Sequence, residues 1–243
     1  MLVWVASFPR SGNTFLRIVL HRLYGIRTSV IYDVDGVAER VGADLVGFTD
    51  RPASLEVMRA SAGVHFIKTH RRRDADVHEQ DGAICLVRDG RDALVSWARQ
   101  ASESDGRRYE AELHARITRR ARIGTGSWGD NVLSWLEPSA SHRPMLRYEE
   151  LVTAPAAAVG RVIAVVAPDL VPQVDAVIPS LDELRRTDDL FFRRGHTGTY
   201  RDELPDGLHQ LFWAQPDNVA AMRLLGYGDG PPPNDELTGD AHR

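Results

Sequence analysis

Residues 4–15 read W-V-A-S-F-P-R-S-G-N-T-F, an apolar run that ends in a polar turn and leads directly into an amphipathic pattern. The apolar run predicts a strand over Leu2–Ser7, and the pattern after the turn predicts a helix over Thr14–Tyr24. The first N–H groups of a helix have no partner within the helix, and its N-terminus carries a partial positive charge. The stretch therefore predicts an anion site, with phosphate as the natural ligand.

Three further short apolar runs predict buried parallel strands, because they are continuous rather than alternating in hydrophobicity. They cover Val64–Lys68, Ala83–Val87 and Met145–Tyr148. Helical patterns separate and follow them, at Ala53–Ala60, Arg91–Gln100, Tyr109–Ile123, Asn131–Leu136, Pro155–Val166, Asp182–Arg186 and in two helices divided at Pro216. This alternation predicts a single-domain α/β fold of the P-loop-like kind, with a central parallel sheet of about four to five strands flanked by helices.

The size and composition fit one α/β domain. The chain has 243 residues, of which 43% are hydrophobic, and we expect the domain to span residues 1–227. Residues 228–243 are expected to form a disordered tail, since they combine prolines with scattered charges. A single cysteine, Cys85, excludes an internal disulfide framework.

The net charge and hydropathy of the chain restrict the classes of partner that we expect for it. A formal net charge of −4 argues against a general nucleic-acid binder, which would normally be basic. No run approaches the ~20 apolar residues of a membrane span. The N-terminus lacks the pattern of a signal peptide, so we expect a cytoplasmic location.

Polar residues follow the predicted strands at the edge where open α/β sheets bind their ligands. After the first strand, Gly12 permits close backbone approach, Thr14 offers a hydroxyl group and Arg10 supplies a fork of donors for oxyanions. The alternative interpretation of this turn is a capped helix start with a surface arginine. The turn differs from a Walker A loop, because no lysine precedes Thr14 and the basic residue comes before the glycine.

The next two strand ends carry a histidine and an arginine. His70 follows Lys68 by two residues, and an imidazole with an ordinary pKa near ~6.5 suits general-base work, although a strand-end histidine can also be structural. Arg88 can hold a second anion through its guanidinium group, unless it pairs with Asp92. We expect Asp89 to cap the following helix.

Taken in order, these motifs resemble the cytosolic-type sulfotransferase family and the related bacterial sulfotransferase domains. The matching segments extend from residue 4 to about residue 201 in the family's order and approximate spacing. They are Ser7–Thr14, Lys68–His70, Arg88 with Ser96, Arg147–Leu151 with Pro155, and Phe192–Gly198. The resemblance implies the co-substrate 3′-phosphoadenosine 5′-phosphosulfate and a small-molecule acceptor with a hydroxyl or amine group, and we expect no metal.

The resemblance also implies roles for single residues. The loop that binds the 5′-phosphosulfate corresponds to Arg10, Ser11, Gly12, Asn13 and Thr14. Residues near the adenine correspond to Phe15 and Tyr148, and the 3′-phosphate would be bound by Arg88, Ser96, Arg193, Arg194 and Gly195. His70 corresponds to the catalytic base, while Lys68 and Arg10 would stabilise charge near the transferred group.

Some positions depart from the family's pattern. Arg10 stands where the cytosolic branch usually has lysine, and arginine hardly donates a proton. The family's dimerisation motif is not recognisable, which leaves open whether the chain is a monomer or a homo-oligomer. The acceptor is expected among Ile31–Ala53, Ala101–Gly126 and His196–Leu204, but their mixed composition does not identify it.

One further segment and two further functions stay open at this point. Trp128 and Trp135 lie seven residues apart, so they either pack in the core, which we favour, or line one helix face. A P-loop ATP-dependent kinase or NTPase would share the sheet and the anion-binding turn. A non-catalytic nucleotide-binding relative would share the whole pattern.

Overall fold

The computed structural model describes residues 1–105, 108–118, 124–189, 191–192, 197–228 and 230. Several predictions fall outside these ranges: the end of the predicted helix 109–123, the site residues Arg193, Arg194 and Gly195, and nearly all of the predicted tail. Among the helices of the described ranges, none has both the length and the apolar character that a membrane crossing requires.

A parallel five-stranded sheet forms the centre of the fold, in agreement with the predicted class. Its strands are β1 (Leu2–Ser7), β2 (Thr28–Val30), β3 (His65–Thr69), β4 (Gly82–Val87) and β5 (Met145–Arg147), in the spatial order β2-β3-β1-β4-β5. The register sets Ala6 opposite Thr69 of β3 and Ser7 opposite Leu86 of β4. The turn after β1 therefore lies between the ends of β3 and β4, where the sequence has His70 and Arg88.

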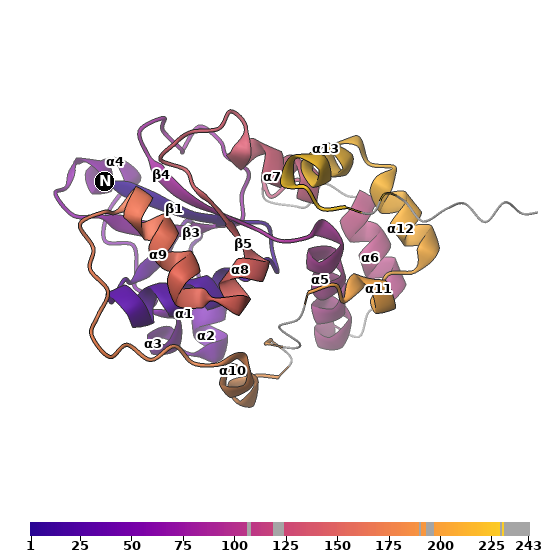
Figure 1. Ribbon diagram of the computed structural model, residues 1–243, viewed down its shortest axis with the longest axis horizontal. Helices are drawn as coiled ribbons and strands as arrows, with labels where there is room; N and C mark the ends of the chain where they lie inside the picture. Colours follow the sequence, from indigo (N-terminus) through magenta and orange to yellow (C-terminus); the bar gives the residue numbers. More distant parts are fainter. Residues whose placement is uncertain (106–107, 119–123, 190, 193–196, 229, 231–243) are drawn as a thin grey trace, which may run out of the picture.

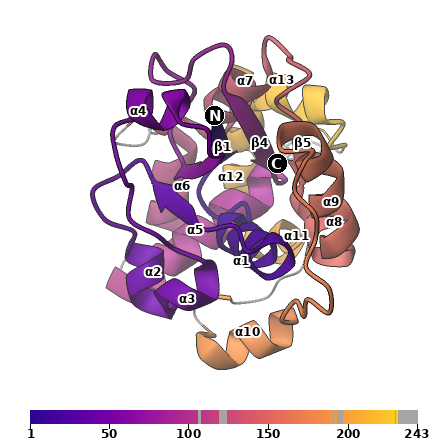
Figure 2. The same ribbon diagram turned by 90° about the vertical axis from the view of Figure 1, so that its left-hand side faces the viewer.

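Thirteen helices of the described residues surround the sheet (Figure 1). They are α1 (Asn13–Tyr24), α2 (Gly36–Val41), α3 (Ala43–Val46), α4 (Leu55–Ala60), α5 (Gly90–Asp105), α6 (Tyr109–Thr118), α7 (Trp128–Leu136), α8 (Tyr148–Thr153), α9 (Pro155–Val166), α10 (Leu181–Thr187), α11 (Tyr200–Glu203), α12 (Asp206–Trp213) and α13 (Pro216–Leu225). Figures 1 and 2 both show α10 at the lower end of the molecule.

The alternating side chains of β1 build two cores, because successive residues of a strand point to opposite faces. Val3 and Val5 pack with α1 and α9 on one face. Trp4 and Ala6 pack on the other, where Trp135 of α7 lies 6.4 Å from Trp4 between ring centroids. A third cluster joins the start of α5 to α6, α7, α12 and α13, which gather beside the sheet on the right of Figure 1.

The two tryptophans of α7 are core residues, as favoured from the sequence. Trp128 is 1% exposed and lies 5.9 Å from Phe212 between ring centroids. A Cβ atom on Gly90 would come within 2.5 Å of the Trp128 ring, so the start of α5 depends on a glycine there. Helix α7 also packs closely on α13, because Gly129 lies against the backbone of Asp217.

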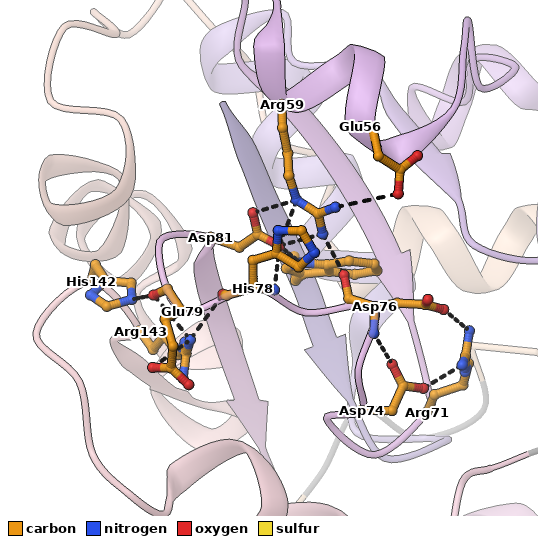
Figure 3. A network of polar contacts seen from close by, with 11 residues as sticks. Glu56, Arg59, Arg71, Asp74, Asp76, His78, Glu79, Asp81, His142 and Arg143 are labelled. Carbon is orange, nitrogen blue, oxygen red and sulfur yellow. Dashed lines mark hydrogen bonds and ion pairs between the residues drawn. The ribbon is translucent and has the colours of Figure 1, made fainter.

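The segment between β3 and β4 is held by a polar network around Asp81 (Figure 3). The Asp81 carboxylate accepts hydrogen bonds from Trp4 Nε1 at 3.0 Å, from the His78 N–H at 3.0 Å and from Arg59 Nε at 2.9 Å. Burial alone would raise the pKa of Asp81, but these donors lower it, so the buried group is a carboxylate. The network fixes the chain that leaves His70.

Candidate active site

A cavity of about 510 Å³ lies at the carboxyl ends of β1, β3 and β4. Its walls include nearly every predicted site residue that the structure describes: Arg10, Gly12, Asn13, Thr14, Phe15, Lys68, His70, Arg88, Ser96 and Tyr148. Ser11 does not line the cavity; it is fully buried within the turn. Helix α2 also lines this cavity, and it lies in the segment 31–53 that was expected at the acceptor; Phe192 belongs to the matched segment 192–198. Walls that the sequence did not predict come from Trp97 and Gln100 of α5 and from Leu181 and Phe191.

The turn after β1 presents backbone donors at the start of α1. Arg10 and Gly12 adopt positive φ angles of 64° and 96°, and a Cβ atom on Gly12 would lie 2.5 Å from the Tyr148 ring. Helix α1 has no side-chain cap at its N-terminus and no acidic residue in its first turn. The buried Ser11 Oγ has no hydrogen-bond partner among the described residues. This donor set suits a phosphate or sulfate group.

His70 is fixed in one tautomer at the end of β3. Its Nδ1 atom lies 2.9 Å from the carbonyl oxygen of Ser7 and 3.2 Å from Ser7 Oγ. Because a carbonyl oxygen can only accept, Nδ1 carries the proton of the neutral ring, which leaves the Nε2 lone pair available as a base. Burial, followed by the positive charge of Lys68, lowers the pKa of His70 well below its ordinary value.

Two residues far away in the sequence hold the His70 backbone. Its N–H donates to the hydroxyl oxygen of Tyr32 at 2.7 Å, and its carbonyl accepts from Asn131 Nδ2 at 3.0 Å. Asn131 also donates to the carbonyl of Thr125 at 2.9 Å, so α7 ties this histidine to the adjoining loop. These backbone contacts have no local sequence signal and were not predicted.

Lys68 lies in the same wall, above the Tyr32 ring, with 5.0 Å between Nζ and the ring centroid. Burial lowers its pKa to about 8, while the nearby Asp35 carboxylate opposes this shift. Asp35 is itself paired with the fully buried Arg17 at 2.6 Å. No ion pair of Lys68 occurs among the described residues, so its ammonium group can face an anionic ligand in the cavity.

Arg10, Ser96 and Arg88 lie together in the cavity wall. Arg10 Nε donates to Ser96 Oγ at 3.2 Å, and Arg88 Nη1 donates to the Arg10 carbonyl at 3.0 Å. The Arg88 guanidinium stacks on Tyr148 at 4.3 Å from the ring centroid. Arg88 also pairs with Asp92, the alternative that the sequence left open, with 3.9 Å between Nη2 and Oδ2. Arg88 nevertheless lines the cavity.

The expected helix cap and an unpredicted rim complete the site. Asp89 Oδ1 accepts from the Arg91 N–H at 2.9 Å, as expected for a residue that caps α5. At the rim, the Phe191 ring lies 4.9 Å from the Arg10 guanidinium and 5.4 Å from that of Arg40. Arg40 is held by Asp188 through two hydrogen bonds of 2.5 and 3.0 Å. Among the described residues that line the cavity, the charged side chains are those of Arg10, Arg40, Lys68 and Arg88 and one carboxylate, that of Asp35.

A parallel sheet with an uncapped, glycine-containing turn after its central strand defines a P-loop-like fold. The protein family described as "Sulfotransferase domain" matches residues 2–167, and the chain belongs to this family. It is a sulfotransferase, and the predicted family is confirmed. Comparison with curated protein sequences gives no match.

Solved structures share the fold. The mouse sulfotransferase SULT7A1 complexed with PAP aligns with a TM-score of 0.64 and 18% identity, over 93% of this chain and 89% of the mouse protein. Retinol dehydratase, in complex with androsterone and the inactive cofactor PAP, aligns with a TM-score of 0.55 and 16% identity, over 96% and 83% of the two chains. At such identities the likeness supports the fold, while ligands are considered below.

Proposed function

We propose that this sulfotransferase moves a sulfuryl group from 3′-phosphoadenosine 5′-phosphosulfate to a hydroxyl or amine group of a small-molecule acceptor, with His70 as general base. The observation that carries the proposal is the His70 ring: Ser7 holds Nδ1, and the ring lines the same cavity as the anion-binding turn and Arg88. Both aligned structures contain PAP, the product that remains when this donor has lost its sulfuryl group. We also propose that the protein acts in the cytoplasm.

The cavity suits such a donor in size and in chemistry. A volume of about 510 Å³ lies within the range of nucleotide-sized sites. The backbone N–H groups of Gly12, Asn13 and Thr14 would hold the 5′-phosphosulfate, and Phe15 with Tyr148 would border the adenine. Arg88 and Ser96 would bind the 3′-phosphate. Arg193, Arg194 and Gly195, which lie outside the described residues, would complete that end.

The chemical step needs positioning and charge stabilisation rather than covalent catalysis. The donor supplies the activated group, since its sulfuryl is held in a mixed anhydride, and we propose that no metal ion takes part. His70 Nε2 accepts the proton of the acceptor hydroxyl as the oxygen attacks sulfur and the bond from sulfur to the 5′-phosphate oxygen breaks. Lys68 and Arg10 stabilise the negative charge that develops on the sulfuryl oxygens and the departing phosphate.

The acceptor belongs, in this proposal, to a second cavity of about 640 Å³. The residues that line this second cavity are Ile31, Tyr32, Asp33, Val34, Arg71, Asp74 and Gly124. Tyr32 connects the two cavities, because its hydroxyl group bonds the His70 N–H and its ring faces Lys68. The lining draws on two of the three segments expected for the acceptor, 31–53 and 101–126.

A transfer assay with sulfur-labelled donor tests this function. The wild-type protein is incubated with a panel of alcohols, phenols and amines, and labelled products are separated and counted. We expect transfer to at least one class of acceptor. Labelling of the same panel from ATP and Mg²⁺, but not from the sulfate donor, would instead support the kinase alternative.

A further inference from the structure

Asp92 is a buried carboxylate that the mechanism above does not use. It lies in the first turn of α5 and its side chain is 1% exposed. Its Oδ2 atom accepts from the Gly198 N–H at 2.7 Å, and its Oδ1 atom accepts from the Tyr200 N–H at 2.9 Å and from Thr199 Oγ1 at 3.1 Å. The segment 198–200 is thereby fastened to α5 across more than a hundred residues of sequence.

On charge alone, the position of this carboxylate is unfavourable for the binding of an anionic ligand by Arg88. It lies 3.9 Å from the guanidinium group of Arg88, which lines the cavity. A negative charge beside an arginine weakens the attraction of that arginine for an anion, by Coulomb's law. Burying a carboxylate is also costly unless it is well hydrogen-bonded. The three donors of the segment 198–200 meet that need, which points to a geometric role.

Asp92 joins three parts of the cavity wall. Arg88 precedes it by four residues, Ser96 follows it by four on the same face of α5, and Thr199 bonds it directly. All three of these neighbours line the cavity. The Arg88 guanidinium is therefore confined between the Tyr148 ring, the Arg10 carbonyl and Asp92.

We propose that Asp92 is a positioning residue of the donor site: it acts through Arg88 and the segment 198–200 to shape the pocket for the 3′-phosphate. The inference rests on the proposed function, because it assumes a donor with that group. The change in anion affinity that it predicts on removal of the Asp92 charge is opposite in sign to the change that simple electrostatics predicts. Removing the charge would strengthen binding of an anion if charge alone mattered, whereas positioning requires that binding weakens.

The experiment measures the affinities of adenosine 3′,5′-bisphosphate and adenosine 5′-monophosphate by calorimetry, for the wild type and for Asp92→Asn. The amide has the same shape as the carboxylate, but its NH2 group is a donor. It therefore faces one of the backbone N–H groups from which the carboxylate accepts a hydrogen bond. We expect the affinity for the bisphosphate to fall by roughly 10- to 100-fold, which is the value of one hydrogen bond to a charged group. The monophosphate, which lacks the 3′-phosphate, should change little.

The matched control is Asp89→Asn. Asp89 is a buried carboxylate three residues away that bonds Arg91 Nη2 at 2.7 Å and does not line the cavity. We expect this variant to lower the melting temperature and to leave the affinity ratio of the two nucleotides unchanged. In an Arg88→Ala background, Asp92→Asn should cost less affinity than in the wild type, because the part of its effect that acts through Arg88 is already lost.

Thr199→Val provides a second variant if Asp92→Asn does not fold, because it removes only one donor to Asp92, and Thr199→Ser is its control. Thr199→Val should lower the affinity ratio, and Thr199→Ser should restore it. An unchanged ratio in both Asp92→Asn and Thr199→Val, or in Thr199→Val if only that variant folds, would overturn the inference. A wild-type protein that does not prefer the bisphosphate over the monophosphate would instead count against the proposed function.

Discussion

The Nδ1 atom of His70 lies 2.9 Å from the carbonyl oxygen of Ser7, the last residue of the central strand. This contact joins β1 to the end of β3 and directs the unprotonated side of the imidazole away from the sheet. Ser7 is buried and pairs with Leu86 of β4, so the proposed base is held by a buried strand of the sheet. In the proposed mechanism, catalysis therefore depends on core packing through one hydrogen bond.

Replacing His70 by alanine should remove the base and spare the donor site. We expect turnover to fall by roughly 10²–10⁴-fold, the usual contribution of a general base, with little change in the affinity for adenosine 3′,5′-bisphosphate. His65→Ala is the matched control, because His65 lies at the other end of the same strand. Turnover is followed with labelled donor; equal rates for wild type and His70→Ala would refute the assignment.

The pKa of His70 should determine where the activity declines at acid pH. In the proposed mechanism the neutral imidazole is the active form, and burial together with Lys68 lowers the pKa of His70 well below the ordinary value. Activity should therefore persist as the pH drops below about 6.5 and decline only near the lowered pKa. The profile of kcat/KM measures this; a decline centred at or above pH 6.5 would contradict it.

The same shift makes the fold sensitive to acid. The unfolded chain takes up a proton on this histidine near pH 6.5, while the folded protein resists protonation to a lower pH. The contribution of His70 to stability is therefore full above the unfolded pKa and is lost as the pH falls toward the folded pKa. Unfolding by urea at a series of pH values should show this dependence, and His70→Ala should reduce it.

Lys68 should set the alkaline side of the profile. Its pKa is lowered to about 8, so the ammonium group that we propose to stabilise the leaving phosphate is lost as the pH rises through that value. Lys68→Arg should move the alkaline decline to higher pH, because arginine stays protonated. Lys68→Met should lower kcat by roughly 10²-fold. An unchanged alkaline limb in Lys68→Arg would exclude Lys68 as its cause.

The site could be predicted from the sequence where it depends on strand ends. Parallel strands bring their carboxyl ends to one edge, so Arg10, His70 and Arg88 had to lie near one another once three strands were recognised. Tyr32, Asn131 and Asp92 could not be assigned in this way. They act on backbone groups 38, 61 and 108 residues away, and no local periodicity records such contacts.

The fold shows the same division. The helix Pro155–Val166 was predicted to the residue, because a proline marks its start and an apolar stripe marks its length. Strand β2 was missed, since Thr28–Val30 has only three residues and two of them are polar. The predicted strand Met145–Tyr148 ends at Arg147, because Tyr148 already begins α8. Short elements depend on the sheet or helix beside them.

The polar network in Figure 3 should contribute a large part of the free energy of unfolding. Asp81 is buried with Arg59, and Asp81→Ala would leave a nearly buried guanidinium group and the Trp4 N–H without their acceptor. We expect a loss of about 3–5 kcal/mol in the free energy of unfolding. Urea denaturation measures it. Glu56→Ala is the control, since the Glu56 side chain is 76% exposed and lies 3.9 Å from Arg59; an equal loss in both variants would contradict the role of Asp81.

The second cavity can be tested by filling it. Val34 is 62% exposed and lines that cavity but not the first. Val34→Trp should raise the KM for the acceptor by roughly 10-fold or more, as expected for obstruction of a pocket, with the KM for the donor unchanged. Val57→Trp, at an exposed valine of α4 outside both cavities, is the control. A rise in the donor KM alone would assign the cavity to the donor.

The central claim is that the cavity between β1, β3 and β4 binds a nucleotide with phosphates at two separate places. Calorimetric titration of the wild-type protein with adenosine 3′,5′-bisphosphate, and separately with ATP and Mg²⁺, tests it most directly. We predict tight binding of the bisphosphate and weak binding of ATP, with the bisphosphate affinity lost in Arg88→Ala. Tighter binding of ATP with Mg²⁺, or a bisphosphate affinity that is indifferent to Arg88, would contradict the account.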